Sequence, residues 1–154
     1  MKRPLVSVII TTQNEDRVIK RLLQSVRIQS YKRIEIIVID NGSFDKTKKM
    51  ANEFTNKIYD RGPERSAQRN FGALKAKGEY LFFLDADMEL TKEIVTECVN
   101  TIQSKAKIEA LIIPEKSIAN NFWEKVKAFE RSFYNLEGDS ITDAARFFKR
   151  NTFH

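Results

Sequence analysis

Apolar residues along this chain alternate between short continuous runs and helically spaced stripes. Runs at residues 5–10, 34–39 and 79–84 are rich in branched and aromatic side chains, which predicts β-strands. Stretches in which apolar residues recur every three or four positions predict helices at residues 16–28, 47–54, 66–74 and 91–102. Strands that alternate with helices of this length favour an α/β fold, a doubly wound, mostly parallel sheet flanked by helices.

Weaker patterns predict the remaining elements. Short strands are expected at residues 57–59, 110–113 and 146–149, and a long amphipathic helix from about residue 119 to residue 134. The run at residues 79–84 is almost entirely apolar, so we expect it to be a central parallel strand that is covered on both faces.

Hydroxyl side chains suggest where two of the helices begin. Ser66 is expected to cap a helix that turns Phe71 and Leu74 toward the core. Thr91 is expected to cap the next helix, whose inward face would include Cys98 as a small buried hydrophobe.

Composition and charge narrow the class of protein. The chain has 154 residues, 42% of them hydrophobic and 31% charged, which is typical of one globular domain. A single cysteine excludes an internal disulfide, and the single histidine, His154, disfavours histidine-based metal sites and Ser-His-Asp catalysis. The net charge of +6 favours anionic partners. Lysine and arginine are dispersed rather than clustered with aromatics, so nucleic acid is not the expected partner.

No signal directs the chain away from the cytoplasm. No apolar segment approaches the length of a membrane span, and no small-residue cleavage site follows the basic start at residues 1–4. We therefore expect a cytoplasmic protein.

The predicted strands are followed by acidic residues and not by the glycine motifs that bind nucleotide phosphates. The five glycines form neither a dinucleotide fingerprint nor a P-loop. Asp85 and Asp87 come directly after the apolar run at residues 79–84, and in extended chain both carboxylates would point to the same side. A divalent ion with a preference for oxygen ligands would relieve their repulsion. The alternative is a solvated turn.

Polar residues also follow the first two predicted strands. Asp40 precedes Gly42 and Ser43, and Asn14 and Glu15 follow the first strand. Asp40 is a candidate acceptor of a hydrogen bond from a base or a ribose. The alternative for both segments is an ordinary loop that opens a helix.

Four blocks in order resemble the family 2 inverting glycosyltransferases of the GT-A fold. They are residues 6–15, 37–47, 65–73 and 77–87. The resemblance implies a nucleotide-diphosphate sugar donor (a UDP- or GDP-sugar) and Mn²⁺ or Mg²⁺. It assigns nucleotide binding to Thr12, Asn14, Glu15, Asp40, Arg69 and Asp85.

The same resemblance implies two metal ligands. The sequence also departs from the family's pattern at two positions. Asp87 would be the principal ligand, with Asp85 near the ribose and the metal. Thr11 stands where the family usually has proline, and Gln13 where it usually has an aromatic residue.

In the family a further acidic motif supplies the catalytic base, and we expect this chain to stop before it, either as a fragment or as a shortened relative that recruits another acid. The candidate replacements form the acidic stretch that carries Glu137, Asp139 and Asp143. The alternative for this stretch is a solvated loop.

The resemblance divides the chain into residues 1–114, a nucleotide-sugar-binding α/β domain, and residues 115–154, the start of an acceptor-side region packed on it. The expected function is metal-dependent transfer of a hexosyl group to a saccharide or lipid-linked acceptor. The alternatives are a nucleotide-sugar-binding module without catalysis and a basic nucleic-acid-binding domain. The helix at residues 119–134 is expected to be core, or to contact the membrane surface through Trp123 and Tyr134 if the acceptor is a lipid.

Overall fold

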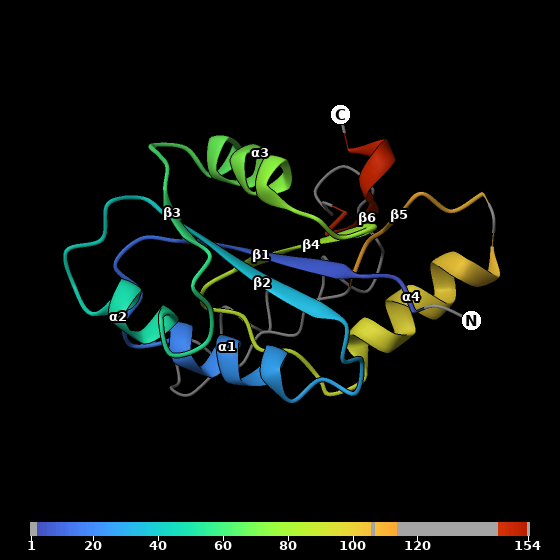
Figure 1. Ribbon diagram of the computed structural model, residues 1–154, viewed down its shortest axis with the longest axis horizontal. Helices are drawn as coiled ribbons and strands as arrows, with labels where there is room; N and C mark the ends of the chain where they lie inside the picture. The colour runs from blue at the N-terminus through green and yellow to red at the C-terminus, as the bar shows by residue number, and fades with distance from the viewer. Residues whose placement is uncertain (1–2, 106, 114–144, 154) are drawn as a thin grey trace, which may run out of the picture. The chain divides into compact units, whose positions relative to one another are not determined.

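A six-stranded sheet with the strand order β3-β2-β1-β4-β6-β5 forms the centre of this computed structural model, which describes residues 3–105, 107–113 and 145–153 (Figure 1). Strands β1, β2, β3 and β4 are parallel, and β6 is antiparallel to both β4 and β5. The strands are β1 Val6–Thr12, β2 Ile34–Asp40, β3 Ile58–Asp60, β4 Tyr80–Asp85, β5 Ala110–Leu111 and β6 Phe147–Lys149. The expected α/β architecture is confirmed.

Helices cover both faces of the sheet. They are α1 Ile19–Arg27, α2 Thr47–Ala51, α3 Arg65–Lys75 and α4 Ile94–Ser104, and a 3-10 helix spans Arg150–Thr152. Figure 1 shows α3 on one face and α1, α2 and α4 on the other. Each crossover between parallel strands therefore carries a helix, as βαβ units require.

Alternation along the strands supplies one apolar layer to each face. On the α3 face, Ile9, Leu81 and Phe83 pack with β2 side chains in one buried cluster. On the other face, α1 buries its apolar stripe. All six residues of β4 are buried, which confirms the expectation of a strand covered on both faces.

Two expectations for α3 are wrong. The helix begins at Arg65, with Glu64 in the N-cap position, so Ser66 lies inside the helix and does not cap it. Leu74 is 80% exposed rather than inward. The buried positions are instead Gln68 and Gly72, because Gln68 pairs its amide with strand carbonyls and Gly72 lets the helix approach the sheet closely.

The predicted cap of α4 is also wrong, whereas its inward face is confirmed. Glu93 holds the N-cap position, and Thr91 accepts hydrogen bonds through its carbonyl oxygen from Gln29 Nε2 at 2.7 Å and from the Ile94 amide at 3.4 Å. Cys98 is buried on the inward face, and burial raises the pKa of its thiol to about 12. A thiol in this state is an inert part of the core.

The last described residues return to the same sheet. Residues Met1–Leu111 and Arg146–His154 form one compact unit, and the strand expected at residues 146–149 is confirmed as β6. The division of function at residue 114 stays a prediction, and the helix expected at residues 119–134 lies outside the described residues. Among the helices described, none is long and apolar enough to cross a membrane.

Replacing Gly72 with valine is expected to lower the free energy of unfolding by about 1–3 kcal/mol, the usual cost of overpacking a core. A Cβ atom at this position would lie 2.4 Å from Cγ2 of Ile9, a fully buried and β-branched side chain. Urea denaturation measures the change. Leu74→Val introduces the same residue on the exposed face of α3 and should cost no more than about 0.5 kcal/mol. Equal stability of the two variants would contradict the close packing of α3 on β1.

Candidate functional site

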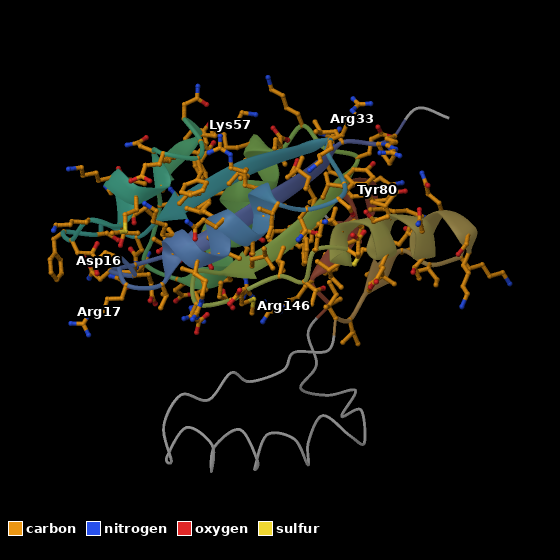
Figure 2. All side chains as sticks on the ribbon, turned by 90° about the horizontal axis from the view of Figure 1, so that it is seen from below. Asp16, Arg17, Arg33, Lys57, Tyr80 and Arg146 are labelled. Carbon is orange, nitrogen blue, oxygen red and sulfur yellow. The ribbon has the colours of Figure 1, made fainter. Side chains whose placement is uncertain are left out.

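The carboxyl ends of three strands meet at one edge of the sheet. In the register of the parallel ladder, Thr12 lies beside Asp40 and Thr11 lies beside Asp85. Ligands of open α/β sheets bind at this edge, outside the carboxyl ends of the strands. Figure 2 shows Asp16, just after β1, at the end of the sheet opposite Arg33, which precedes β2.

The loops after β1 and β2 are joined by hydrogen bonds. The backbone amide of Asn14 donates to Ser43 Oγ at 2.8 Å, and the backbone amide of Phe44 donates to the side-chain oxygen Oδ1 of Asn14 at 3.1 Å. Asn14 has a φ of 52°, a left-handed conformation that asparagine tolerates better than most residues. The ordinary loop role considered for these residues is therefore present in the structure.

Glu15 belongs to the same joined loops and faces the loop after β4. Its amide donates to Thr47 Oγ1 at 2.8 Å. Burial raises the pKa of its carboxyl, repulsion by Asp87 raises it further, and the guanidinium of Arg65 opposes both effects. The negative charges of Glu15 and Asp87 therefore interact across the edge.

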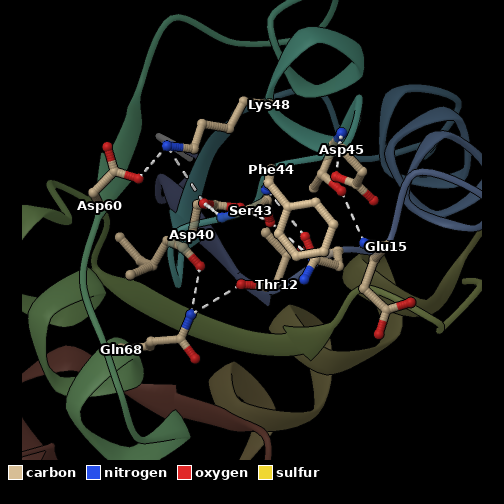
Figure 3. Close-up of polar contacts among 12 residues, drawn as sticks. Thr12, Glu15, Asp40, Ser43, Phe44, Asp45, Lys48, Asp60 and Gln68 are labelled. Atoms are coloured by element: carbon tan, nitrogen blue, oxygen red, sulfur yellow. Dashed lines mark hydrogen bonds and ion pairs between the residues drawn. The ribbon is translucent and has the colours of Figure 1, made fainter.

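Asp40 is fully buried and bonded within its own turn. The Ser43 amide donates to Oδ1 at 2.7 Å, and Ser43 Oγ donates to Oδ2 at 2.5 Å. Lys48 Nζ lies 3.6 Å from Oδ1 of Asp40 and 2.5 Å from Oδ1 of Asp60, so it bridges the two carboxylates (Figure 3). The hydrogen bond to Asp60 raises the pKa of Lys48. The Asp40 carboxylate thus stabilises the turn after β2. Its contact with a nucleotide base stays a prediction.

Gln68 is a positioning residue that no sequence pattern predicted. Its Nε2 donates to the carbonyl oxygens of Thr12 at 3.2 Å and of Ile39 at 2.8 Å, as Figure 3 shows for the link from α3 to β1. The side chain is 3% exposed. A polar residue at an inward helix position was the available signal, and it indicates that α3 is fastened to the ends of two strands.

Asp85 is the point where cationic side chains converge. Thr11 Oγ1 donates to Oδ1 at 2.9 Å, and Arg69 Nη2 donates to both carboxylate oxygens at 3.1 and 3.2 Å. Arg146 Nη1 lies 3.4 Å from Oδ2. Burial alone would raise the pKa of Asp85, but the Thr11 hydrogen bond and the charges of Arg69 and Arg146 outweigh it and lower that pKa. Asp85 is therefore an ionised carboxylate at neutral pH.

The expected geometry of Asp85 and Asp87 is wrong. Strand β4 ends at Asp85, and the next residues form a turn in which the Met88 amide donates to the Asp85 carbonyl oxygen at 3.1 Å. Asp87 is exposed in this turn rather than in extended chain. The two side chains do not lie on one face of a strand, because the chain turns before Asp87.

The residues at this edge fit a divalent ion through Asp87. Within the described ranges, no three Asp, Glu, His or Cys side chains are grouped to hold a metal. The oxygens of Asp85 already accept from a hydroxyl and guanidinium groups, whereas no described residue donates to the exposed Asp87 carboxylate. Magnesium-type ions are often held by one or two carboxylates together with substrate phosphates. The base candidates Glu137, Asp139 and Asp143 lie outside the described residues.

The chain belongs to glycosyl transferase family 2, which it matches over residues 7–153. A β-1,3-glucosyltransferase of Campylobacter jejuni named for the substrate GalNAc(5)-diNAcBac-PP-undecaprenol is 33% identical over 113 residues, which are 67% of this chain and 35% of that protein. The 4,4'-diaponeurosporenoate glycosyltransferase of Staphylococcus haemolyticus is 34% identical over 110 residues, 66% of this chain and 28% of that protein. The chain thus spans roughly a third of the length of these relatives.

Solved structures share the fold. Residues 1–349 of S. aureus TarS in complex with UDP-GlcNAc align with a TM-score of 0.68 and 26% identity, covering 77% of this chain and 36% of that one. The mannosyltransferase PcManGT of Pyrobaculum calidifontis, in complex with GDP-Man and Mn²⁺, aligns with a TM-score of 0.72 and 21% identity. That alignment covers 98% of this chain and 46% of the other. The fold is therefore the GT-A glycosyltransferase fold.

Replacing Thr11 with valine is expected to lower the free energy of unfolding by about 1.5–3 kcal/mol, because a hydrogen bond to a charged carboxylate is lost. The pKa of Asp85 should also rise toward its ordinary value of 3.8. A lowered pKa contributes stability that is present above pH 3.8 and is lost as the pH falls below it. The variant should therefore lose less stability on acidification, as measured by urea denaturation at neutral pH and below pH 3.8.

Thr12→Val is the matched control. Thr12 Oγ1 is buried without a hydrogen-bond partner among the described residues, so its removal should be neutral or stabilising. A Thr12 variant at least as destabilised as the Thr11 variant would contradict the hydrogen bond to Asp85.

Proposed function

We propose that this chain carries the donor-binding part of a glycosyltransferase. The enzyme would transfer a hexosyl group from a UDP- or GDP-sugar to an acceptor hydroxyl by metal-assisted inverting displacement. The single observation that supports the proposal most is the convergence of Arg69 on Asp85 beside the exposed Asp87, at the ligand-binding edge of the sheet. UDP-GlcNAc bound to the related TarS supports a nucleotide-sugar donor.

The donor would lie across the ends of β1, β2 and β4. The joined loops that carry Thr12, Asn14 and Glu15 would line the base, with Asp40 at its edge. Arg69, whose guanidinium lies at Asp85, would approach the diphosphate, because guanidinium groups pair well with phosphate oxygens. A loop pair held by hydrogen bonds loses little entropy when the donor binds.

Asp87 would hold the divalent ion together with the diphosphate oxygens. The Mn²⁺ of the PcManGT structure supports this part of the proposal. When bound, the ion would supply Lewis-acid neutralisation of the leaving diphosphate. Asp85 would instead orient the arginines, since its oxygens accept from them and from Thr11.

The acceptor hydroxyl would attack the anomeric carbon from the face opposite the diphosphate, and a general base would take its proton. Such a base contributes about 10²–10⁴-fold to the rate. Glu137, Asp139 and Asp143 remain the proposed candidates. A saccharide or lipid-linked acceptor is proposed by analogy with the undecaprenol-linked substrate in the name of the C. jejuni relative. A lipid acceptor would favour a location at the cytoplasmic membrane surface.

A nucleotide-sugar-binding module without catalysis is the second candidate. It is favoured because the residues gathered at the described edge all suit donor binding. Binding without turnover would distinguish it from the enzyme.

Asp87→Asn is expected to abolish the gain in UDP or GDP affinity that Mn²⁺ provides. The reduction should be about tenfold or more, since one contact to a charged group contributes about 1.5–3 kcal/mol. Titration calorimetry with and without Mn²⁺ measures this difference. Wild-type protein that binds neither nucleotide under either condition would contradict the proposed donor site.

Glu89→Gln is the control for this variant. It removes the same charge from the same loop, but Glu89 pairs with Arg21 at 3.4 Å. Its Mn²⁺-dependent gain should match that of the wild type. An undiminished gain in Asp87→Asn would exclude Asp87 as the metal ligand.

A further inference from the structure

Phe44 is the most exposed large apolar side chain among the described residues. It is 90% exposed and lies on the loop that leads from β2 into α2. Single apolar residues are common on protein surfaces, so exposure alone assigns no role. The place of Phe44 is informative, because its loop is one of the two joined loops at the ligand-binding edge of the sheet. Figure 3 shows the ring projecting from this loop rather than into the core.

The backbone that carries this ring is fixed on both sides. The backbone amide of Phe44 donates to Oδ1 of Asn14 at 3.1 Å. Before it, Ser43 donates through its amide and its hydroxyl to the buried Asp40 carboxylate. After it, the Asp45 carboxylate accepts from a backbone amide of the loop after β1 at 3.1 Å and from that of the first residue of α2 at 2.9 Å. A ligand that packs on the ring therefore orders only side-chain torsions, since the backbone is already held.

Phe44 is the only apolar residue on the joined loops. The other residues at positions 12–17 and 41–47 are polar, charged or glycine. Such loops can bond the polar edges of a nucleobase, but only Phe44 offers a surface to its flat, apolar faces. Aromatic side chains stack on bases of any identity, because every base has a π-face. The ring therefore suits a planar aromatic ligand.

The order of the strands brings the base, and not the diphosphate, to this loop. Arg69 contacts Asp85 at the end of β4, and Asp87 follows in the next turn, so the groups that suit phosphate and metal lie after β4. Strand β1 lies between β4 and β2, and Phe44 follows β2. A donor that lies across these three strand ends with its diphosphate at Arg69 would place its base at the joined loops.

We propose that Phe44 is the stacking platform for the nucleobase of the donor. The inference rests on the proposed function, since the base is that of the nucleotide sugar. It adds a residue to which the resemblance assigns no role. The ring would pack against one face of the base while polar groups of the joined loops bond its edges. Because stacking does not depend on the identity of the base, Phe44 would strengthen the binding of uracil and guanine alike.

Titration calorimetry with UDP and GDP in the presence of Mg²⁺ tests this role in Phe44→Ala. For each nucleotide that the wild type binds, the variant should lose about fivefold or more in affinity, as expected for one stacked base. The variant should fold normally, because a side chain this exposed makes few packing contacts.

Ile28→Ala is the matched control. It also removes an exposed apolar side chain, 59% exposed, but Ile28 follows α1, at the end of that helix far from the joined loops. Its nucleotide affinity should stay within about twofold of that of the wild type.

Phe44→Trp adds a second readout, the fluorescence of the introduced indole. The variant keeps an aromatic face, so its nucleotide affinity should stay within about threefold of that of the wild type. Bound nucleotide should quench the added fluorescence. The wild type, whose single tryptophan is Trp123, supplies the baseline.

The outcomes separate the two proposals. Wild-type protein that binds neither nucleotide overturns the donor site and, with it, the role of Phe44. Wild-type affinity retained in Phe44→Ala overturns the role of Phe44 alone; if that variant also fails to bind vesicles of anionic lipid that the wild type binds, the ring belongs to a membrane contact instead. An equal loss in Phe44→Trp or in Ile28→Ala, or an indole that nucleotide does not quench, also overturns the stacking role.

Discussion

A carboxylate buried at the end of a central strand must be paired, and the way Asp85 is paired organises the ligand-binding edge. Its oxygens accept from Thr11 on β1 and from Arg69 on α3, and Arg146, which directly precedes β6, lies beside them. Removing such a group from water costs several kcal/mol unless hydrogen bonds and opposite charges replace the solvent. One side chain of β4 therefore links a neighbouring strand, a covering helix and the antiparallel end of the sheet.

Hydrogen bonds between side chains and backbone groups hold the rest of the ligand-binding edge in a similar way. Gln68 bonds the carbonyl oxygens of Thr12 and Ile39, and Ser43 joins the loop after β1 to the buried Asp40. These contacts fix loops that would otherwise be ordered only when a ligand binds. A preformed edge fits a protein of glycosyl transferase family 2.

The sequence predicted the strands well and the helix faces less well. Branched and apolar runs marked β1, β2 and β4 because a parallel strand covered on both faces must be apolar throughout. Leu74 was assigned inward by its spacing, but Gln68 and Gly72 take the buried positions through hydrogen bonding and close approach. Apolar periodicity cannot detect either effect, since both depend on the partner surface.

For the candidate site too, some residues were predicted from the sequence and others were not. Ordered motifs pointed to Asp85 and Arg69, which the fold does bring together. Arg146 was not predicted because its position depends on the antiparallel register of β6 with β4, a long-range pairing that no local pattern reports. Asp87 was misplaced because the turn closed by Met88 interrupts the strand after Asp85.

A crystal structure of the chain grown with UDP and Mn²⁺, with anomalous data collected for manganese, tests the central claim most directly. The account predicts a manganese peak at the Asp87 carboxylate and phosphate oxygens in contact with the Arg69 guanidinium group, which Asp85 aligns. A nucleotide bound away from the carboxyl ends of β1, β2 and β4, or manganese with no contact to Asp87, would contradict it.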